Sequence, residues 1–370
     1  MLNHFAVGTP LLLGQSLMDD WTVLLVLITI LVLVGLLVVG QILKRQPETN
    51  FDPAIIRTFN KRVVAALTMC VVLVVALLAS NKVITVVLFG LVSFWALREF
   101  ITMTPTRRGD HRTLFWVFFL FTPMQYVFVA MIPDNYLTLT RMNAFTLFTL
   151  VIPVYAMLFI PARIAFTSDH KRFLERSAKI QFGLLICVYA LSHAPALLYL
   201  DLKSYNVSAS DVQQGIEALD TTAATNGLQE WNGSPAGLLF FLLVIVQVSD
   251  MLQFVWDRVA GQRVIAATVH PTKTWEGLIG AACSTTIVGI LIQLLMPVTP
   301  FTWHGAGLMA LLISIMASSG GMTMSAIKRD RKVKDYGTLV QGHAGVLDRI
   351  DSICFAAPIF FHVTRLFLER

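Results

Sequence analysis

Charged residues are scarce in this chain. Asp, Glu, Lys and Arg make up only 14% of its 370 residues, whereas 56% are hydrophobic, and the mean hydropathy is +0.71. This composition excludes a water-soluble globular fold. Cysteines are also few: Cys70, Cys187, Cys283 and Cys354 all lie in apolar stretches, and no CxxC pair occurs. A disulfide framework and a zinc knuckle are therefore excluded.

Long apolar runs dominate what is present. Runs of about 20 apolar residues are long enough to cross the hydrocarbon core as helices, and their lack of alternation excludes a β-barrel. We therefore predict an all-α, polytopic integral membrane protein with about 10 transmembrane helices (9 to 10). The predicted spans are 21–43, 63–80, 83–102, 113–133, 142–160, 180–199, 236–256, 277–297, 304–325 and 352–368.

The region before the first span argues against a cleavable signal. Its twenty residues include Asp19 and Asp20 but no Lys or Arg, the opposite of the basic start of a signal peptide. We expect the first span to remain as an anchor.

The positive charges predict an orientation. Alternate loops, taken as 44–62, 98–113, 161–179, 250–276 and 328–351, hold 23 of the 28 Lys and Arg. Because cytoplasmic loops are rich in Lys and Arg, this pattern places these loops inside and both termini outside. The net charge of +6 then needs no nucleic-acid partner, and none is predicted.

The chain is predicted to have three parts. Residues 1–200 form about six N-terminal transmembrane helices, and 201–235 form an extracytoplasmic loop with at most a short helix near 210–220. Residues 236–370 form a C-terminal transmembrane catalytic region, with cytoplasmic site loops at 257–276 and 326–351. Polar residues concentrate in this last part, where chemistry is therefore expected.

The span 236–256 ends in a polar stripe. Gln247, Asp250, Gln253 and Asp257 share one helix face at three- and four-residue spacing. One interpretation is that the span ends near 248 and water solvates the stripe. The other is that Asp250 faces a water-filled cavity, since ionisable groups at depth are costly unless hydrated or paired.

A denser group of polar residues follows the ninth span. Ser325, Lys328 and Arg329 share a helix face, and Asp348 and Asp351 share another. Each fragment alone is typical of helix ends and lipid headgroup contacts. Together, cations, glycines and paired carboxylates are what a polyphosphate and its divalent cation require.

These residues resemble a known family. Ser325, Lys328-Arg329, Lys334-Asp335, Tyr336-Gly337, Gly342-His343-Ala344-Gly345 and Asp348-Arg349-Ile350-Asp351 look like the signature of the phosphatidate cytidylyltransferases, or CDP-diacylglycerol synthases. An upstream block resembles the family in order and spacing: Ser249-Asp250, Gln253-Phe254, Arg258, Gly261, Pro271 and Lys273 to Gly277. The resemblance covers about 235–357.

The resemblance implies transfer of CMP from CTP to phosphatidic acid, giving CDP-diacylglycerol and pyrophosphate, with Mg²⁺ as cofactor. It implies that Asp348 binds the metal, supported by Asp351, Asp335 and Asp250. It assigns Lys328, Arg329, Lys334 and Arg349 to charge neutralisation. The remaining implied site residues are His343, Gly342 and Gly345 around the phosphates, and Ser325 and Lys273 from neighbouring helices.

The chain also departs from the family pattern. Gly321 and Met324 stand where bacterial members usually carry an Asp and a Glu, so a metal ligand is missing there, and Asp250 is the candidate replacement. Ala344 and Gln341 replace a Gly and a Pro. Before Lys273, His270 and Thr272 replace a Ser and a Lys, and Asp257 replaces a Gly.

Two alternative functions stay open. The chain could be a CTP-dependent transferase for a different lipid acceptor, or a non-catalytic paralogue or transporter in which Gln247, Asp250 and Gln253 line a permeation path. The resemblance allows a homodimer. Short loops favour a bacterial plasma (inner) membrane, with the site on the cytoplasmic side.

Overall fold

The computed structural model describes residues 17–45, 53–103, 107–132, 143–167, 170–200, 233–333 and 345–368. Within these residues, ten helices are long and apolar enough to cross a membrane. They confirm the predicted all-α, polytopic membrane protein. The segment 210–220, where a short helix was predicted, lies outside the described residues, as do Lys334, Asp335, Gly342 and His343.

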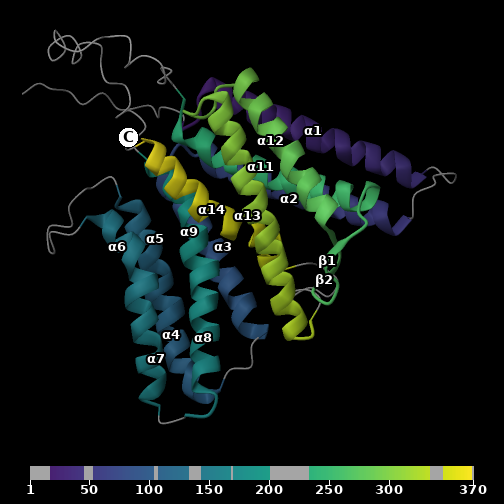
Figure 1. Cartoon of the computed structure of the whole chain (residues 1–370). Coiled ribbons are helices and arrows are strands. Elements are labelled where there is room, and N and C mark those ends of the chain that lie inside the picture. Colours follow the sequence, from purple (N-terminus) through teal and green to yellow (C-terminus); the bar gives the residue numbers. More distant parts are fainter. Residues whose placement is uncertain are drawn as a thin grey trace, which may run out of the picture.

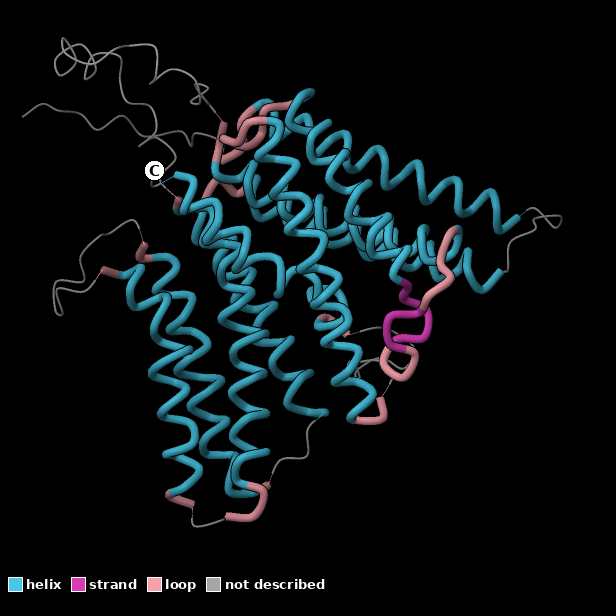
Figure 2. The backbone as a smooth tube through the Cα atoms, in the orientation of Figure 1, coloured by secondary structure: helices cyan, strands magenta, loops and turns pink. Residues whose placement is uncertain are grey.

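Helices make up almost all of the described chain (Figure 1 and Figure 2). The α-helices are α1 (Asp20–Arg45), α2 (Pro53–Leu78), α3 (Lys82–Met103), α4 (His111–Trp116), α5 (Thr122–Ala130), α6 (Ala144–Leu150), α7 (Met157–Ala165), α8 (Phe173–Leu184), α9 (Leu191–Ala196), α11 (Pro235–Val259), α12 (Trp275–Leu295), α13 (Trp303–Asp330) and α14 (Leu347–Leu368). The strands are β1 (Val264–Ala266) and β2 (His270–Thr274).

Three spans combine α-helical pieces with wider turns. π-Helical stretches at Val117–Phe121, Val151–Ala156 and Leu185–Ala190 join α4 to α5, α6 to α7 and α8 to α9. A π-turn adds a residue to the helical ladder and bends the helix axis locally. Each pair still forms one continuous span.

The helices form two groups with a shared middle. Figure 1 shows α4 to α9 as one bundle and α1, α2, α11 and α12 as another, with α3, α13 and α14 between them. Two of the central helices contact both groups: α14 packs on α9 and α11, and α3 packs on α5 and α2. α13 packs on α11, α12 and α14. Large side chains such as Phe148, Phe241 and Phe361 are fully buried in the core.

The region around the site differs from prediction in two ways. The loop predicted at 257–276 contains an antiparallel hairpin, in which Val264 lies opposite Thr274 and Ala266 opposite His270. The last two spans also extend further than predicted, so α13 continues to Asp330 and α14 begins at Leu347. Both helices end in polar residues at this side, as helix ends commonly do. Hydropathy identifies only apolar segments, so these polar turns were not predicted to be helical.

Candidate functional site

A polar cavity of about 370 Å³ lies among α2, α11, β2, α13 and α14. Seven of the predicted site residues line it: Asp250, Lys273, Ser325, Lys328, Asp348, Arg349 and Asp351. All four side chains of the polar stripe, from Gln247 to Asp257, lie in its wall as well. α11 continues past residue 248 to Val259, so the stripe belongs to the helix and faces this cavity.

The close packing of α13 and α14 brings Lys328 to Asp348. Lys328 lies in the last turn of α13 and Asp348 in the first turn of α14. The Lys328 Nζ lies 2.9 Å from Asp348 Oδ1, and the other carboxylate oxygen accepts the backbone N–H of Gly345 at 3.1 Å. The basic residue at a helix C-terminus and the acidic one at an N-terminus also suit the two helix dipoles.

Two carboxylates, those of Asp250 and Asp351, also line the cavity. Asp250 of α11 accepts a hydrogen bond from the Ser352 hydroxyl at 3.1 Å, and Asp351 accepts the Ser352 backbone N–H at 2.8 Å. Ser352 therefore links the two carboxylates across the contact between α11 and α14.

Two adjacent glycines of α13 shape this wall. A Cβ added to Gly320 would lie 2.7 Å from the backbone oxygen of Asp351, so this glycine permits the close approach of α14. A Cβ added to Gly321 would lie 3.0 Å from Lys273 Nζ. Gly321 thus leaves room for the Lys273 ammonium at a position where an acidic residue was expected from the family pattern.

Lys273 is brought into the cavity by the β1–β2 hairpin. Asp257 of α11 fixes the hairpin, because its Oδ1 accepts both the backbone N–H of Thr274 at 2.9 Å and the Thr274 hydroxyl at 2.8 Å. The Thr274 hydroxyl in turn caps α12 by accepting the N–H of Gly277 at 3.0 Å. This is the structural role of Asp257, the residue that departs from the family's usual Gly.

The site environment alters the acid–base properties of two hairpin residues. Burial lowers the pKa of Lys273, while Asp250 and Asp351 act in the opposite direction. Burial, together with the cations Lys273 and Lys328, lowers the pKa of His270 to about 4. His270 is therefore neutral near pH 7 and adds no positive charge to the cavity.

Two predicted residues lie beside the cavity rather than in its wall. Arg329 is exposed, and its Nε donates to the carbonyl of Val269 at 3.2 Å, so it holds the hairpin turn. Gly345 contributes its N–H to Asp348. Ser325 lines the cavity, and its hydroxyl donates to the carbonyl of Gly321 at 2.7 Å.

Two residues of the N-terminal half contribute to the site but were not predicted from the sequence. Arg62 of α2 lines the cavity, although the sequence suggested only that it belonged to a basic loop. Glu99 of α3 is 6% exposed and accepts the backbone N–H groups of Val346 at 3.1 Å and Leu347 at 2.9 Å. Glu99 could have been identified from the sequence, because it is a lone carboxylate inside a predicted span. No feature of the sequence distinguished Arg62 from the other basic residues of its loop.

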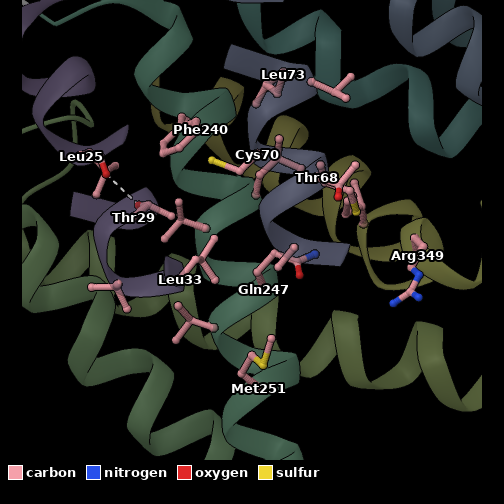
Figure 3. Close-up of a pocket in the computed structure, with 18 of the residues that line it drawn as sticks. Leu25, Thr29, Leu33, Thr68, Cys70, Leu73, Phe240, Gln247, Met251 and Arg349 are labelled. Carbon is pink, nitrogen blue, oxygen red and sulfur yellow. Dashed lines mark hydrogen bonds between the residues drawn. The ribbon is translucent and has the colours of Figure 1, made fainter. Parts of the chain in front are cut away.

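An apolar cavity of about 670 Å³ adjoins the polar one. Figure 3 shows its wall, which includes Leu25 and Leu33 from α1, Leu73 from α2 and Phe240 from α11. The two cavities share four lining residues: Met69, Gln247, Met251 and Arg349. A charged site therefore meets a hydrocarbon-lined space within the spans.

Comparison with known proteins agrees with this geometry. The model of the cytidylyltransferase family matches residues 60–367. That range includes α2 and α3 as well as the signature segments, so it extends well beyond the resemblance found in the sequence.

Individual relatives point the same way. The uncharacterized protein YnbB of Escherichia coli (strain K12) is 35% identical over 281 residues, which are 76% of this chain and 79% of that protein. The phosphatidate cytidylyltransferase of Brucella abortus biovar 1 (strain 9-941) is 35% identical over 131 residues, 35% of this chain and 48% of its own. That of Haemophilus influenzae is 35% identical over 126 residues, 33% of this chain and 44% of its own.

The matches to the two named enzymes thus span about half of those proteins. The family model, in contrast, matches most of the present chain, from α2 to the end of α14. The chain is therefore an integral membrane nucleotidyltransferase that belongs to the cytidylyltransferase family.

Proposed function

We propose that this protein is a phosphatidate cytidylyltransferase, which converts CTP and phosphatidic acid to CDP-diacylglycerol and pyrophosphate. The observation that carries the proposal is the meeting of the two cavities, because the acceptor must hold a phosphate in a polar site and acyl chains in an apolar one. Arg349 lies in the walls of both cavities, where the phosphate of a membrane lipid would be.

The reaction makes electrostatic demands that the polar cavity can meet. An oxygen of the lipid phosphate attacks the α-phosphorus of CTP, and the bond from that phosphorus to the bridging oxygen of the β-phosphate breaks, releasing pyrophosphate. Two unit charges 4 Å apart repel by about 4 kcal/mol at an effective dielectric constant of 20. Neutralising the two anionic substrates is therefore the main catalytic task.

Five cationic side chains line the polar cavity, against four carboxylates. Several carboxylates already have partners, since Asp348 pairs with Lys328 and Asp257 binds Thr274. The cations can then position and neutralise phosphate groups. No general base is needed, because a phosphate monoester, with a second pKa of about 6, is largely a dianion at neutral pH.

The carboxylates Asp250 and Asp351 fit a magnesium ion. They line one cavity from two helices, and Mg²⁺ is usually held by one or two carboxylates together with water and substrate phosphates. Among the described residues no group of three or more His, Cys, Asp or Glu side chains forms a complete metal site. We therefore assign Asp250 and Asp351 as the protein ligands, with Asp348 and Asp335 as further candidates from the signature.

When bound, Mg²⁺ would neutralise phosphate oxygens and the departing pyrophosphate. The chain's own residues would orient the reactants. Lys328 and Lys273 would contact the phosphates, and Ser352 would position the Asp250 and Asp351 carboxylates by donating a hydrogen bond to each. Positive charge in the adjoining loops supports a site on the cytoplasmic side of a bacterial inner membrane.

The test is an assay of purified protein in bilayers of uncharged lipid with labelled CTP and Mg²⁺. We expect CDP-diacylglycerol and pyrophosphate to form together, and only when phosphatidic acid is added. A panel of other lipid phosphates, including a polyprenyl phosphate, tests the acceptor. Transfer of label to another acceptor but not to phosphatidic acid would refute the proposed substrate, and no transfer to any acceptor would refute the activity.

A further inference from the structure

Two arginines share one aromatic ring in the wall of the polar cavity. The guanidinium carbon of Arg62 lies 4.9 Å from the centroid of the Phe254 ring, and that of Arg258 lies at the same distance of 4.9 Å. Arg62 comes from α2, whereas Phe254 and Arg258 lie one turn apart on α11. The ring therefore holds together guanidinium groups from two helices that are distant in the sequence.

Stacking orients a guanidinium group while leaving its N–H donors available. A guanidinium on an aromatic face keeps its planar fork of donors directed outward, where it matches the oxygens of a phosphate. Arg62, Phe254 and Arg258 all line the polar cavity. The ring of Phe59 stacks on the ring of Phe254, with 6.4 Å between the two centroids.

Arg62 and Arg258 form no ion pair with an acidic residue of the described chain. The nearby acidic residues have other hydrogen-bond partners, Asp257 with Thr274 and Asp250 with Ser352, although the charge of Asp250 also interacts with that of Arg62. Placing two like charges on one ring is unfavourable unless an anion binds between or beside them.

The charge of Arg62 acts on two residues of the hairpin. Besides burial, the charge of Arg62 contributes to lowering the pKa of both Lys273 and His270. Arg62 therefore lies close enough to act on Lys273 of the upstream signature block, and it lines the same cavity, although its helix lies outside both signature blocks.

We propose that Arg62 and Arg258, held on the ring of Phe254, form a clamp for a substrate phosphate group. This inference rests on the proposed function for the identity of its ligand, which is a phosphate of either the nucleotide or the lipid. The clamp makes α2 part of the substrate site.

The test compares Arg62→Gln and Arg258→Gln with Lys61→Gln. Lys61 neighbours Arg62 on α2, is exposed and does not line the cavity, so its variant removes the same charge without touching the clamp. Two probes are titrated separately in uncharged bilayers, CTP and dioctanoyl phosphatidic acid, and binding is measured directly. We expect each clamp variant to weaken binding of one probe by about tenfold or more, as the loss of a charge-assisted bidentate contact implies.

The probe that loses affinity identifies the phosphate. Weaker binding of CTP alone assigns the clamp to the triphosphate, and weaker binding of phosphatidic acid alone assigns it to the lipid. Arg62→Lys keeps the charge but not the planar fork, so it should recover only part of the affinity. Phe254→Leu should weaken the same probe as the arginine variants, because it removes the ring that orients both side chains.

The clamp is refuted if Arg62→Gln and Arg258→Gln bind both probes as tightly as Lys61→Gln does, or if the unaltered protein binds neither. A protein that binds the probes through these arginines but transfers no CMP would refute the proposed function and leave the clamp standing. If a glutamine variant fails to fold, Arg62→Lys and Phe254→Leu decide the question by the same titrations.

Discussion

Two ion pairs, one in each part of the molecule, show how differently this chain uses charge. In the bundle of α4 to α9, Arg176 of α8 pairs with Asp110, and their side chains are only 5% and 1% exposed. At the site, Lys328 and Asp348 are 18% and 8% exposed and line a cavity.

The partners of the two pairs explain the difference. Asp110 also accepts the backbone N–H of Arg107 at 3.0 Å, and Arg176 donates to the carbonyl of Lys171 at 3.2 Å. The first pair is thus surrounded by its own loops and fixes the end of a bundle. The second faces open space, where its charges can act on a ligand. The Asp110–Arg176 pair is thus enclosed by the fold, whereas the Lys328–Asp348 pair is accessible from the cavity.

The largest effect is expected when one member of the Asp110–Arg176 pair is removed. Asp110→Ala leaves the Arg176 guanidinium buried without its counter-charge, which costs about 3–5 kcal/mol. We expect a large drop in thermal stability, measured by the unfolding of the detergent-solubilised protein. Cytidylyl transfer per folded molecule should change little.

A double variant checks the cause. Asp110→Ala combined with Arg176→Met removes both charges, so it should recover much of the lost stability. If the double variant is as unstable as Asp110→Ala, the unpaired charge is not the origin of the effect.

Removing the carboxylate of the Lys328–Asp348 pair should instead lower activity and leave stability nearly unchanged. Asp348→Asn keeps the shape of the side chain but removes the charge that pairs with Lys328 and faces the substrates. We expect cytidylyl transfer to fall by about 100-fold or more, in line with the loss of one preorganised electrostatic contact, with little change in thermal stability. Unaltered turnover would reject any role of Asp348 in catalysis.

Glu99 tests whether the two parts are mechanically linked. Its carboxylate on α3 accepts two backbone N–H groups at the start of α14, just before Asp348. Glu99→Ala leaves both N–H groups without this acceptor, and we expect a loss of about 2 kcal/mol in stability together with reduced transfer.

Glu99→Gln is the matched control, because its amide oxygen can still accept one N–H. It should lose roughly half as much stability as the alanine variant. Equal losses in the two variants would indicate that Glu99 acts through its charge rather than through these hydrogen bonds.

The smallest effect is expected at Gly321. A methyl group there would lie 3.0 Å from the Lys273 Nζ, and the flexible lysine can move by a few tenths of an ångström. Gly321→Ala should therefore lower cytidylyl transfer by only a few-fold. The free energy of unfolding should rise by about 1 kcal/mol, because alanine favours a helix more than glycine does. The matched control is Gly35→Ala on α1, where an added Cβ meets no atom within 4 Å. Equal activities of the two variants would remove the proposed spacing role of Gly321.

Much of the fold was predictable because hydrophobic length is a local property. Each span was recognisable from its own residues, and the ten helices confirm the prediction. Errors arose at span ends, where α13 and α14 continue into polar residues, and in the hairpin that contains Lys273. Those boundaries depend on capping and on contacts with other helices, such as the bonds from Glu99 to α14.

The candidate site was predictable only in part. The signature placed Lys328, Asp348 and Asp351 in one group, and the structure brings these residues to one cavity. Arg329 was predicted to belong to the site from its place in the signature, yet it lies beside the cavity, because its side chain donates to the carbonyl of Val269 in the hairpin. Arg62 was missed because its place in the site depends on the packing of α2 against α11.

The sequence by itself determined the membrane fold, the family and the chemical character of the site, since apolar length and motif spacing are written along the chain. Only the tertiary structure decided that the polar cavity meets an apolar one, that Arg62 shares a ring with Arg258, and that Glu99 holds the helix bearing Asp348. The physical reason is that these features join residues from different helices, whose proximity arises from packing across the whole bundle.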